Sequence, residues 1–191
     1  MKILLTLFVL FFSSLLFAED ISDFEIEGMS IGDSLLDYMS EDEIINNDQK
    51  VYSDNSKFLA INFNGKKNIY DYVYLYVKRN DNKYIIYLIR AANLVNNKNQ
   101  CLKTKNEIVM KIKSLFKNTY NQEGSQKHYY YKNSTQYISQ FSFGKDARVS
   151  DHARVECLII HEKDKKQEEG ISSTLEILLQ SAEFGRWLTN Q

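Results

Sequence analysis

The chain has 191 residues, and its 24 basic and 25 acidic side chains leave a formal net charge of −1. An apolar fraction of 43% with 26% charged residues is typical of a globular protein and excludes a disordered or collagen-like chain. A pI of about 6.3 provides no strong positive field to attract phosphates, so we expect no nucleic-acid partner.

The near-neutral total conceals two oppositely charged segments. Residues 19–49 hold eleven acidic and no basic side chains. Residues 50–191 hold 23 basic and 14 acidic side chains, which leaves +9. Because opposite charges attract, we expect the acidic segment to fold against, or close to, the basic remainder of the chain.

The first eighteen residues are typical of a secretory signal peptide. Lys2 is followed by an apolar run from Ile3 to Phe12, and the small residue Ala18 precedes Glu19. This run is shorter than the roughly 20 residues that a membrane-spanning helix needs. We therefore expect cleavage between Ala18 and Glu19, and the alternative is an uncleaved N-terminal anchor.

Signal removal would leave residues 19–191, enough for a single exported domain with possible halves 19–97 and 98–191. No later apolar run reaches 18 residues, so we expect no transmembrane span in the mature chain. The mature chain holds two cysteines, Cys101 and Cys157. Such a pair in an exported protein predicts a disulfide bond, and the alternative is two buried thiols or one reactive thiol.

The first elements expected along the chain are two short helices. The apolar residues around Leu35 and Met39 indicate one, and the capping box Ser40–Glu43 opens the other. Three strands are expected next. Residues 58–63 form an apolar run, residues 70–78 alternate between aliphatic and aromatic side chains, and residues 83–95 are apolar on both faces.

The clearest helix is expected from about residue 105 to 118, with residues 104–107 as its capping box and Cys101 just ahead of it. Strands are then expected at residues 128–132, 137–143, 155–160 and 175–179, before a short C-terminal helix at 184–188.

This order of elements predicts an α+β fold with antiparallel β-meanders. The helices comprise a helix pair, one long amphipathic helix and the short C-terminal helix. Two helix–three-strand units are one possible arrangement, but the two halves share no residue-level repeat.

The sequence contains none of the common catalytic, nucleotide-binding or zinc motifs that we considered. Its three histidines, His128, His152 and His161, are far apart and suit surface positions near turns better than a catalytic or metal site. We therefore expect no catalytic residue, no metal site and no cofactor. An enzyme is still an alternative, because catalytic groups can assemble from distant positions.

Four alternating tyrosines form the first candidate binding surface: Tyr70, Tyr72, Tyr74 and Tyr76. Tyrosine offers a large amphipathic contact area and is enriched at recognition surfaces. The alternative is a strand face that packs under a helix or against neighbouring strands. The run Tyr129–Tyr131 permits the same two interpretations.

A lysine-rich helix face is the second candidate, for contacts with an anionic partner: Lys103, Lys111, Lys113 and Lys117. After export, such a partner would be an anionic lipid or a lipopolysaccharide phosphate. The alternative is a solvated helix face, because exposed helix positions are commonly lysine.

Residues 26–38, with the sequence Ile-Glu-Gly-Met-Ser-Ile-Gly-Asp-Ser-Leu-Leu-Asp-Tyr, and the following residues 39–44 resemble the opening of a group of small exported proteins. These are uncharacterised proteins of AT-rich marine alphaproteobacteria, and the resemblance implies an envelope location without implying an activity. Gly28-Met29-Ser30 ahead of paired short helices and a three-strand meander is also similar to the BamE and β-lactamase-inhibitor-like fold, although the lipidated cysteine of the BamE type is missing.

Together these features predict a periplasmic or secreted binding or interaction module. Its expected partner is an envelope protein or an anionic envelope component. The alternatives are an envelope hydrolase and an envelope-assembly accessory factor.

Overall fold

The computed structural model describes residues 20–53, 55–63, 69–146 and 149–190. The expected signal peptide and its cleavage point between Ala18 and Glu19 lie outside the described residues.

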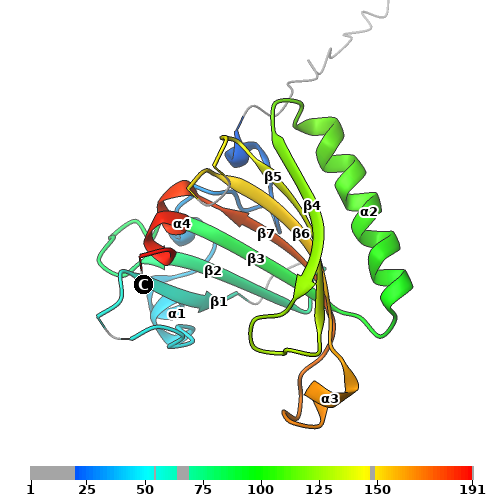
Figure 1. Ribbon diagram of the computed structural model, residues 1–191. Coiled ribbons are helices and arrows are strands. Elements are labelled where there is room, and N and C mark those ends of the chain that lie inside the picture. Colours follow the sequence, from blue (N-terminus) through cyan, green and yellow to red (C-terminus); the bar gives the residue numbers. More distant parts are fainter. Residues whose placement is uncertain (1–19, 54, 64–68, 147–148, 191) are drawn as a thin grey trace, which may run out of the picture.

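Seven strands form one antiparallel sheet in the order β1-β2-β3-β7-β6-β5-β4 (Figure 1). The strands are β1 (Phe58–Asn62), β2 (Tyr72–Lys78), β3 (Ile86–Leu94), β4 (Tyr120–Lys127), β5 (Thr135–Ser142), β6 (His152–Ile159) and β7 (Thr174–Gln180). The helices are α1 (Glu41–Asn46), α2 (Lys98–Leu115), α3 (Glu162–Lys165) and α4 (Ala182–Leu188). Single 3-10 turns span Ile21–Asp23 and Leu35–Asp37. The predicted α+β fold with an antiparallel sheet is thus confirmed.

The path of the chain is a three-stranded meander followed by a return from the opposite edge. After β3, helix α2 carries the chain to β4, and the strands then return through β5 and β6. Strand β7 finally inserts between β6 and β3, and it pairs with β3 from Leu88↔Gln180 to Leu94↔Thr174. The two groups of strands therefore share one sheet.

The two faces of the sheet carry different cores, because successive side chains of a strand point to opposite faces. On one face, Cys101, Val109 and Ile112 of α2 join the larger core, together with apolar side chains from the N-terminal segment. On the other face, Phe184 of α4 packs in a smaller core with Phe58. Figure 1 shows α2 running along one side of the sheet and α4 lying against the other.

The acidic segment docks through its apolar side chains. Its residues Ile26, Met29 and Ile44 are buried in the larger core. The ring of Phe24 lies 6.0 Å from that of Phe116, which caps the C-terminal end of α2. The start of the acidic segment therefore lies beside the C-terminal end of the lysine-rich helix. The burial of apolar side chains is sufficient to explain this position.

The long helix begins earlier than expected. Asn97 caps α2 by accepting a hydrogen bond from the Gln100 backbone N–H, so Thr104 and Glu107 lie inside the helix. Cys101 consequently lies in the first turns of α2, where it faces the sheet. The predicted capping box at Ser40 and Glu43 is confirmed for α1.

The prediction of a strand at residues 128–132 is wrong. Strand β4 occupies residues 120–127, and residues 128–134 form the turn into β5. All eight residues of β4 are exposed, so the strand lacks the apolar alternation by which a half-buried strand is found in a sequence.

The predicted disulfide bond between Cys101 and Cys157 is confirmed, and both residues are fully buried. It joins the start of α2 to β6 across a sequence separation of 56 residues. None of the described helices is both long and apolar enough to cross a membrane.

Replacing both Cys101 and Cys157 with serine should lower the free energy of unfolding by about 4 kcal/mol. Without the bond, no covalent loop restricts the conformational entropy of the unfolded chain. Urea unfolding of the variant and of the oxidised protein measures this difference. Equal unfolding midpoints, or two alkylatable thiols in the native protein, would contradict the assignment.

Candidate functional site

The sheet face opposite α2 is the candidate site, and it is called the open face below. Its side chains form two adjacent rows across the strands from β2 to β4. The first row is Tyr74, Arg90, Leu178, Arg154, Gln140 and Gln122, and the second is Tyr72, Ala92, Glu176, Glu156, Ile138 and Gly124. Residues directly opposite each other on paired strands share a face, so each row is a continuous line of neighbouring positions, and only Gly124 at the end of the second row lacks a side chain.

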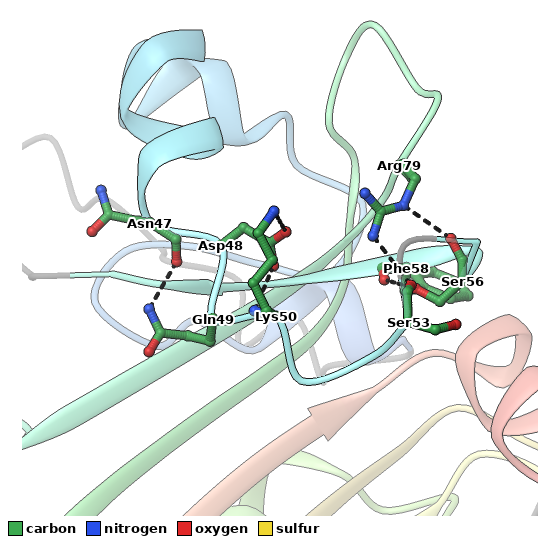
Figure 2. A network of polar contacts seen from close by, with 8 residues as sticks. All are labelled: Asn47, Asp48, Gln49, Lys50, Ser53, Ser56, Phe58 and Arg79. Carbon is green, nitrogen blue, oxygen red and sulfur yellow. Dashed lines mark hydrogen bonds and ion pairs between the residues drawn. The ribbon is translucent and has the colours of Figure 1, made fainter.

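Helix α4 and Tyr52 cover one end of the open face. The Tyr52 ring lies 4.9 Å from that of Trp187 at the end of α4. Figure 2 shows how the segment that carries Tyr52 is attached: the Arg79 guanidinium donates hydrogen bonds to the carbonyl oxygens of Ser53 and Ser56. Burial raises the pKa of Tyr52 to about 12, so its hydroxyl stays protonated at neutral pH.

The turn between β4 and β5, residues 128–134, forms the opposite rim. The His128 Nδ1 accepts hydrogen bonds from the backbone N–H groups of Tyr130 and Tyr131. The buried Asp164 carboxylate accepts three more from the backbone and side chain of Asn133 and from the hydroxyl of Ser134. These bonds fix the turn, although the side chains of Tyr129 and Tyr130 are 74% and 77% exposed.

Three adjoining hollows lie on the open face. The central one, of about 500 Å³, is lined by Tyr52, Arg90, Arg154 and Glu156 and by the turn at His128–Tyr130. A second, of about 390 Å³, shares Arg90 and extends toward β2, and a third, of about 320 Å³, shares Arg154 and extends toward β4. The hollows therefore follow the two side-chain rows across the sheet.

A bidentate ion pair spans the junction between β3 and β7. The Arg90 guanidinium donates to both carboxylate oxygens of Glu176 at 2.7 and 2.9 Å, and the Thr174 hydroxyl donates a third bond to that carboxylate. Burial alone would raise the pKa of Glu176, but the bonds from Arg90 outweigh it and hold this pKa below its usual range. The Glu176 side chain is almost fully buried, whereas that of Arg90 is 42% exposed.

A second pair lies beside it on β6. The Arg154 Nε is 3.1 Å from the Glu156 Oε2, and Gln136 donates to the other carboxylate oxygen of Glu156. The Arg154 Nε and the Glu156 Oε2 attract each other as charges but are not aligned as a hydrogen bond. Both atoms are buried and have no hydrogen-bond partner among the described residues. Buried polar atoms of this kind are rare and require an explanation.

The tyrosine ladder divides between environments. Tyr72 is 43% exposed on the open face and lines the second hollow together with Tyr74. Tyr76 is on the same face but is buried beneath α4, with its ring 5.2 Å from that of Phe184. Tyr70 precedes β2 and packs against the larger core of the other face.

The lysine candidates lie away from the open face. Lys103, Lys111 and Lys113 are exposed on α2, and Lys117 is exposed just beyond its end. Lys113 forms an ion pair of 2.7 Å with Glu123 on β4. The related Lys105 is buried instead and donates to the Ser139 hydroxyl, and burial lowers its pKa.

The three histidines have separate structural roles. His152 is buried at the start of β6, where a surface position was expected, because β5 and β7 flank its strand on both sides. His161 accepts the Lys163 backbone N–H and caps α3. Within the part of the chain that the structure describes, no cluster of three or more His, Cys, Asp or Glu residues could hold a metal ion.

Four charged residues of the open face were not predicted as site residues from the sequence: Arg90, Arg154, Glu156 and Glu176. Each is a charged position within a largely apolar strand. These charged positions can be seen in the sequence, but the order of the strands that brings the four residues together cannot.

No protein family, curated protein or solved structure matches the chain.

Arg90→Met should cost about 3 kcal/mol of unfolding free energy, because it leaves the Glu176 carboxylate buried without its counter-charge. The double variant Arg90→Met/Glu176→Leu should recover most of that loss, because no unpaired charge then remains. Urea unfolding measures both. The control is Lys113→Met, which breaks an exposed pair and should cost about 0–1 kcal/mol. A cost for Arg90→Met no larger than this control would contradict the account.

Protonation of His128 should loosen the turn at residues 128–134, because a protonated Nδ1 cannot accept the two backbone N–H groups. Burial lowers the pKa of His128 from its ordinary value of 6.5, although Glu156 and Glu176 oppose this shift. The contribution of His128 to stability is therefore complete above pH 6.5 and is lost as the pH falls below that value.

Amide NMR signals of Tyr130 and Tyr131, followed between about pH 8 and 5, test this expectation by their shift and broadening with the His128 titration. His128→Asn should abolish the pH dependence, since an amide oxygen accepts the same bonds without titrating. His161→Asn is the matched control and should leave it intact. Signals that do not change with pH in the unmodified protein would refute the role of His128.

Proposed function

We propose that this protein is an exported binding module that holds its ligand on the open face. The observation that carries the proposal is the set of three adjoining hollows across the six strands from β2 to β4, which are lined by the charged side chains of Arg90, Arg154, Glu156 and Glu176. Binding sites commonly combine such concave surfaces with a few fixed polar groups.

The proposed location is the periplasm or the exterior of the cell. The intramolecular disulfide bond supports it, because such bonds persist in oxidising compartments. The apolar N-terminal run and the resemblance of residues 26–44 to small exported bacterial proteins are further support. Mass spectrometry of the exported protein should find a chain that begins at Glu19.

The pairing of Glu176 with Arg90 favours binding over hydrolysis. A hydrolase of the two-carboxylate type needs one protonated acid with a raised pKa. Glu176 and Glu156 are direct cross-strand neighbours, so the open face does hold two adjacent carboxylates. However, Arg90 holds the pKa of Glu176 below its usual range, and the carboxylate stays ionised. Glu176 is thus suited to fixing the position of Arg90 and not to donating a proton.

The rims supply adaptable contacts around this fixed centre. Tyr72, Tyr129 and Tyr130 are exposed aromatic side chains that border the hollows. Tyrosine provides contact area with little loss of side-chain entropy and can also donate a hydrogen bond. The lysines of α2 lie on the other side of the sheet, so an anionic partner would require a separate surface.

Site-specific photo-crosslinking tests the proposal. A photoreactive phenylalanine analogue at Tyr130, on the rim of the open face, should give adducts when the native protein is exposed to an envelope extract of the producing organism. The same analogue at Met110, which is 63% exposed on α2, is the matched control. Adducts of equal yield and composition at both positions, or none at Tyr130, would refute binding at the open face.

A further inference from the structure

We propose that the ligand of the open face is a neutral, linear oligosaccharide. This inference rests on the proposed function and specifies the chemistry of its ligand. It is drawn from the charge balance of the face, the kind of hydrogen-bonding groups it presents, its aromatic rim and its length.

The charges of the open face are already balanced. Arg90 is neutralised by Glu176, and Arg154 lies against Glu156, so these four central groups sum to zero. A charged ligand would have to compete with these internal pairs, and a buried charge without its partner is costly. The centre of the face is therefore matched to a ligand that is polar and uncharged.

Hydroxyl groups suit the polar groups that stay exposed at the centre. The side chains of Arg90 and Arg154 are 42% and 30% exposed, and a guanidinium can donate hydrogen bonds to the hydroxyl oxygens of a ligand. The Arg154 Nε and the Glu156 Oε2 are themselves buried and paired with each other as charges. Bonds to charged groups are also stronger than those between neutral ones.

Side-chain amides surround this centre and extend the same chemistry. Five glutamines border the hollows: Gln122, Gln126, Gln136, Gln140 and Gln180. Each amide carries both donor and acceptor atoms, as does each hydroxyl of a sugar. Vicinal hydroxyls along a saccharide would therefore meet partners of the matching type at several positions.

An extended peptide fits the open face less well. Peptides add to sheets through main-chain hydrogen bonds at an exposed edge strand. The strands beneath the open face between β3 and β5 are paired on both sides, so their backbone groups are engaged in the sheet. Only side chains are available there, and these suit a ligand whose own polar groups point outward around its rings.

The aromatic rim suits the apolar faces of sugar rings. The rings of Tyr129 and Tyr130 lie 4.9 Å apart and nearly perpendicular, and the Lys132 ammonium lies over the ring of Tyr129. Tyr130 is therefore the better stacking platform on this rim, and Tyr72 provides another at the β2 end of the face. The C–H groups of a saccharide ring can pack on such rings while its hydroxyls face the amides.

The length of the face favours an oligosaccharide over a single sugar. The two rows run from β2 to β4, across five strand-to-strand spacings of about 4.8 Å, or about 24 Å in all. This distance accommodates several linked sugar rings. The three hollows along it would each receive part of the chain.

Titration monitored by amide NMR tests the inference with soluble probes. The neutral probes are hexamers of β-1,4-glucose, β-1,3-glucose, α-1,4-glucose, β-1,4-mannose and β-1,4-N-acetylglucosamine. The comparison probes are an alginate hexamer, which is anionic, and an uncharged octapeptide. At least one neutral hexamer should bind with a Kd below about 1 mM and shift amides of β3, β5, β6 and β7.

Variants then locate the binding. Tyr130→Ala and Gln136→Ala should each weaken the neutral hexamer by about threefold to tenfold, while Met110→Ala should leave its affinity unchanged. Dispersed amide signals from α2 and from the larger core show that each variant is folded.

Three results would overturn the inference. The first is that only the alginate hexamer or only the peptide binds. The second is that no neutral hexamer binds. The third is that the open-face variants bind a neutral hexamer with unchanged affinity. The photo-crosslinking at Tyr130 separates these failures from failure of the proposed function. A specific adduct that contains no carbohydrate would leave the binding module intact and reject only the oligosaccharide.

Discussion

The double pairing of β7, with β3 on one side and β6 on the other, is the constraint on which the rest of the structure depends. Without it, the meander β1–β3 and the strands β4–β6 would be two small sheets, each with two unpaired edge strands. With it, a single surface crosses the whole molecule. The ion pair of Arg90 with Glu176 reinforces the junction, since its two members come from β3 and β7.

The two faces of this sheet differ in what covers them. Helix α2, the N-terminal segment and the bond between Cys101 and Cys157 cover one face with apolar contacts and a covalent link. The other face keeps charges near its centre and is covered only toward the end where α4 packs. Internal ion pairing makes this polarity tolerable, because each buried carboxylate lies against a guanidinium.

Much of the fold, but little of the site, follows from local patterns in the sequence. Alternation and apolar runs predicted β1, β2, β3, β5, β6 and β7, and the presence of one cysteine pair in a chain expected to be exported predicted the bond between Cys101 and Cys157. The edge strand β4 was placed wrongly because it has no apolar face. The start of α2 was placed too late because a second capping pattern at Thr104 follows the true N-cap at Asn97. The cluster around Arg90 could not be predicted, because strand order is a tertiary property that local periodicity does not encode.

Native-state hydrogen exchange of the backbone amides tests most directly whether the two groups of strands form one cooperative sheet. The account predicts that protected amides of β3, β6 and β7 exchange with the same free energy, equal to that of global unfolding. It also predicts that the exposed edge strand β4 exchanges at lower cost. Amides of β3 that open independently of those of β6, with β7 following only one of them, would contradict a single continuous open face.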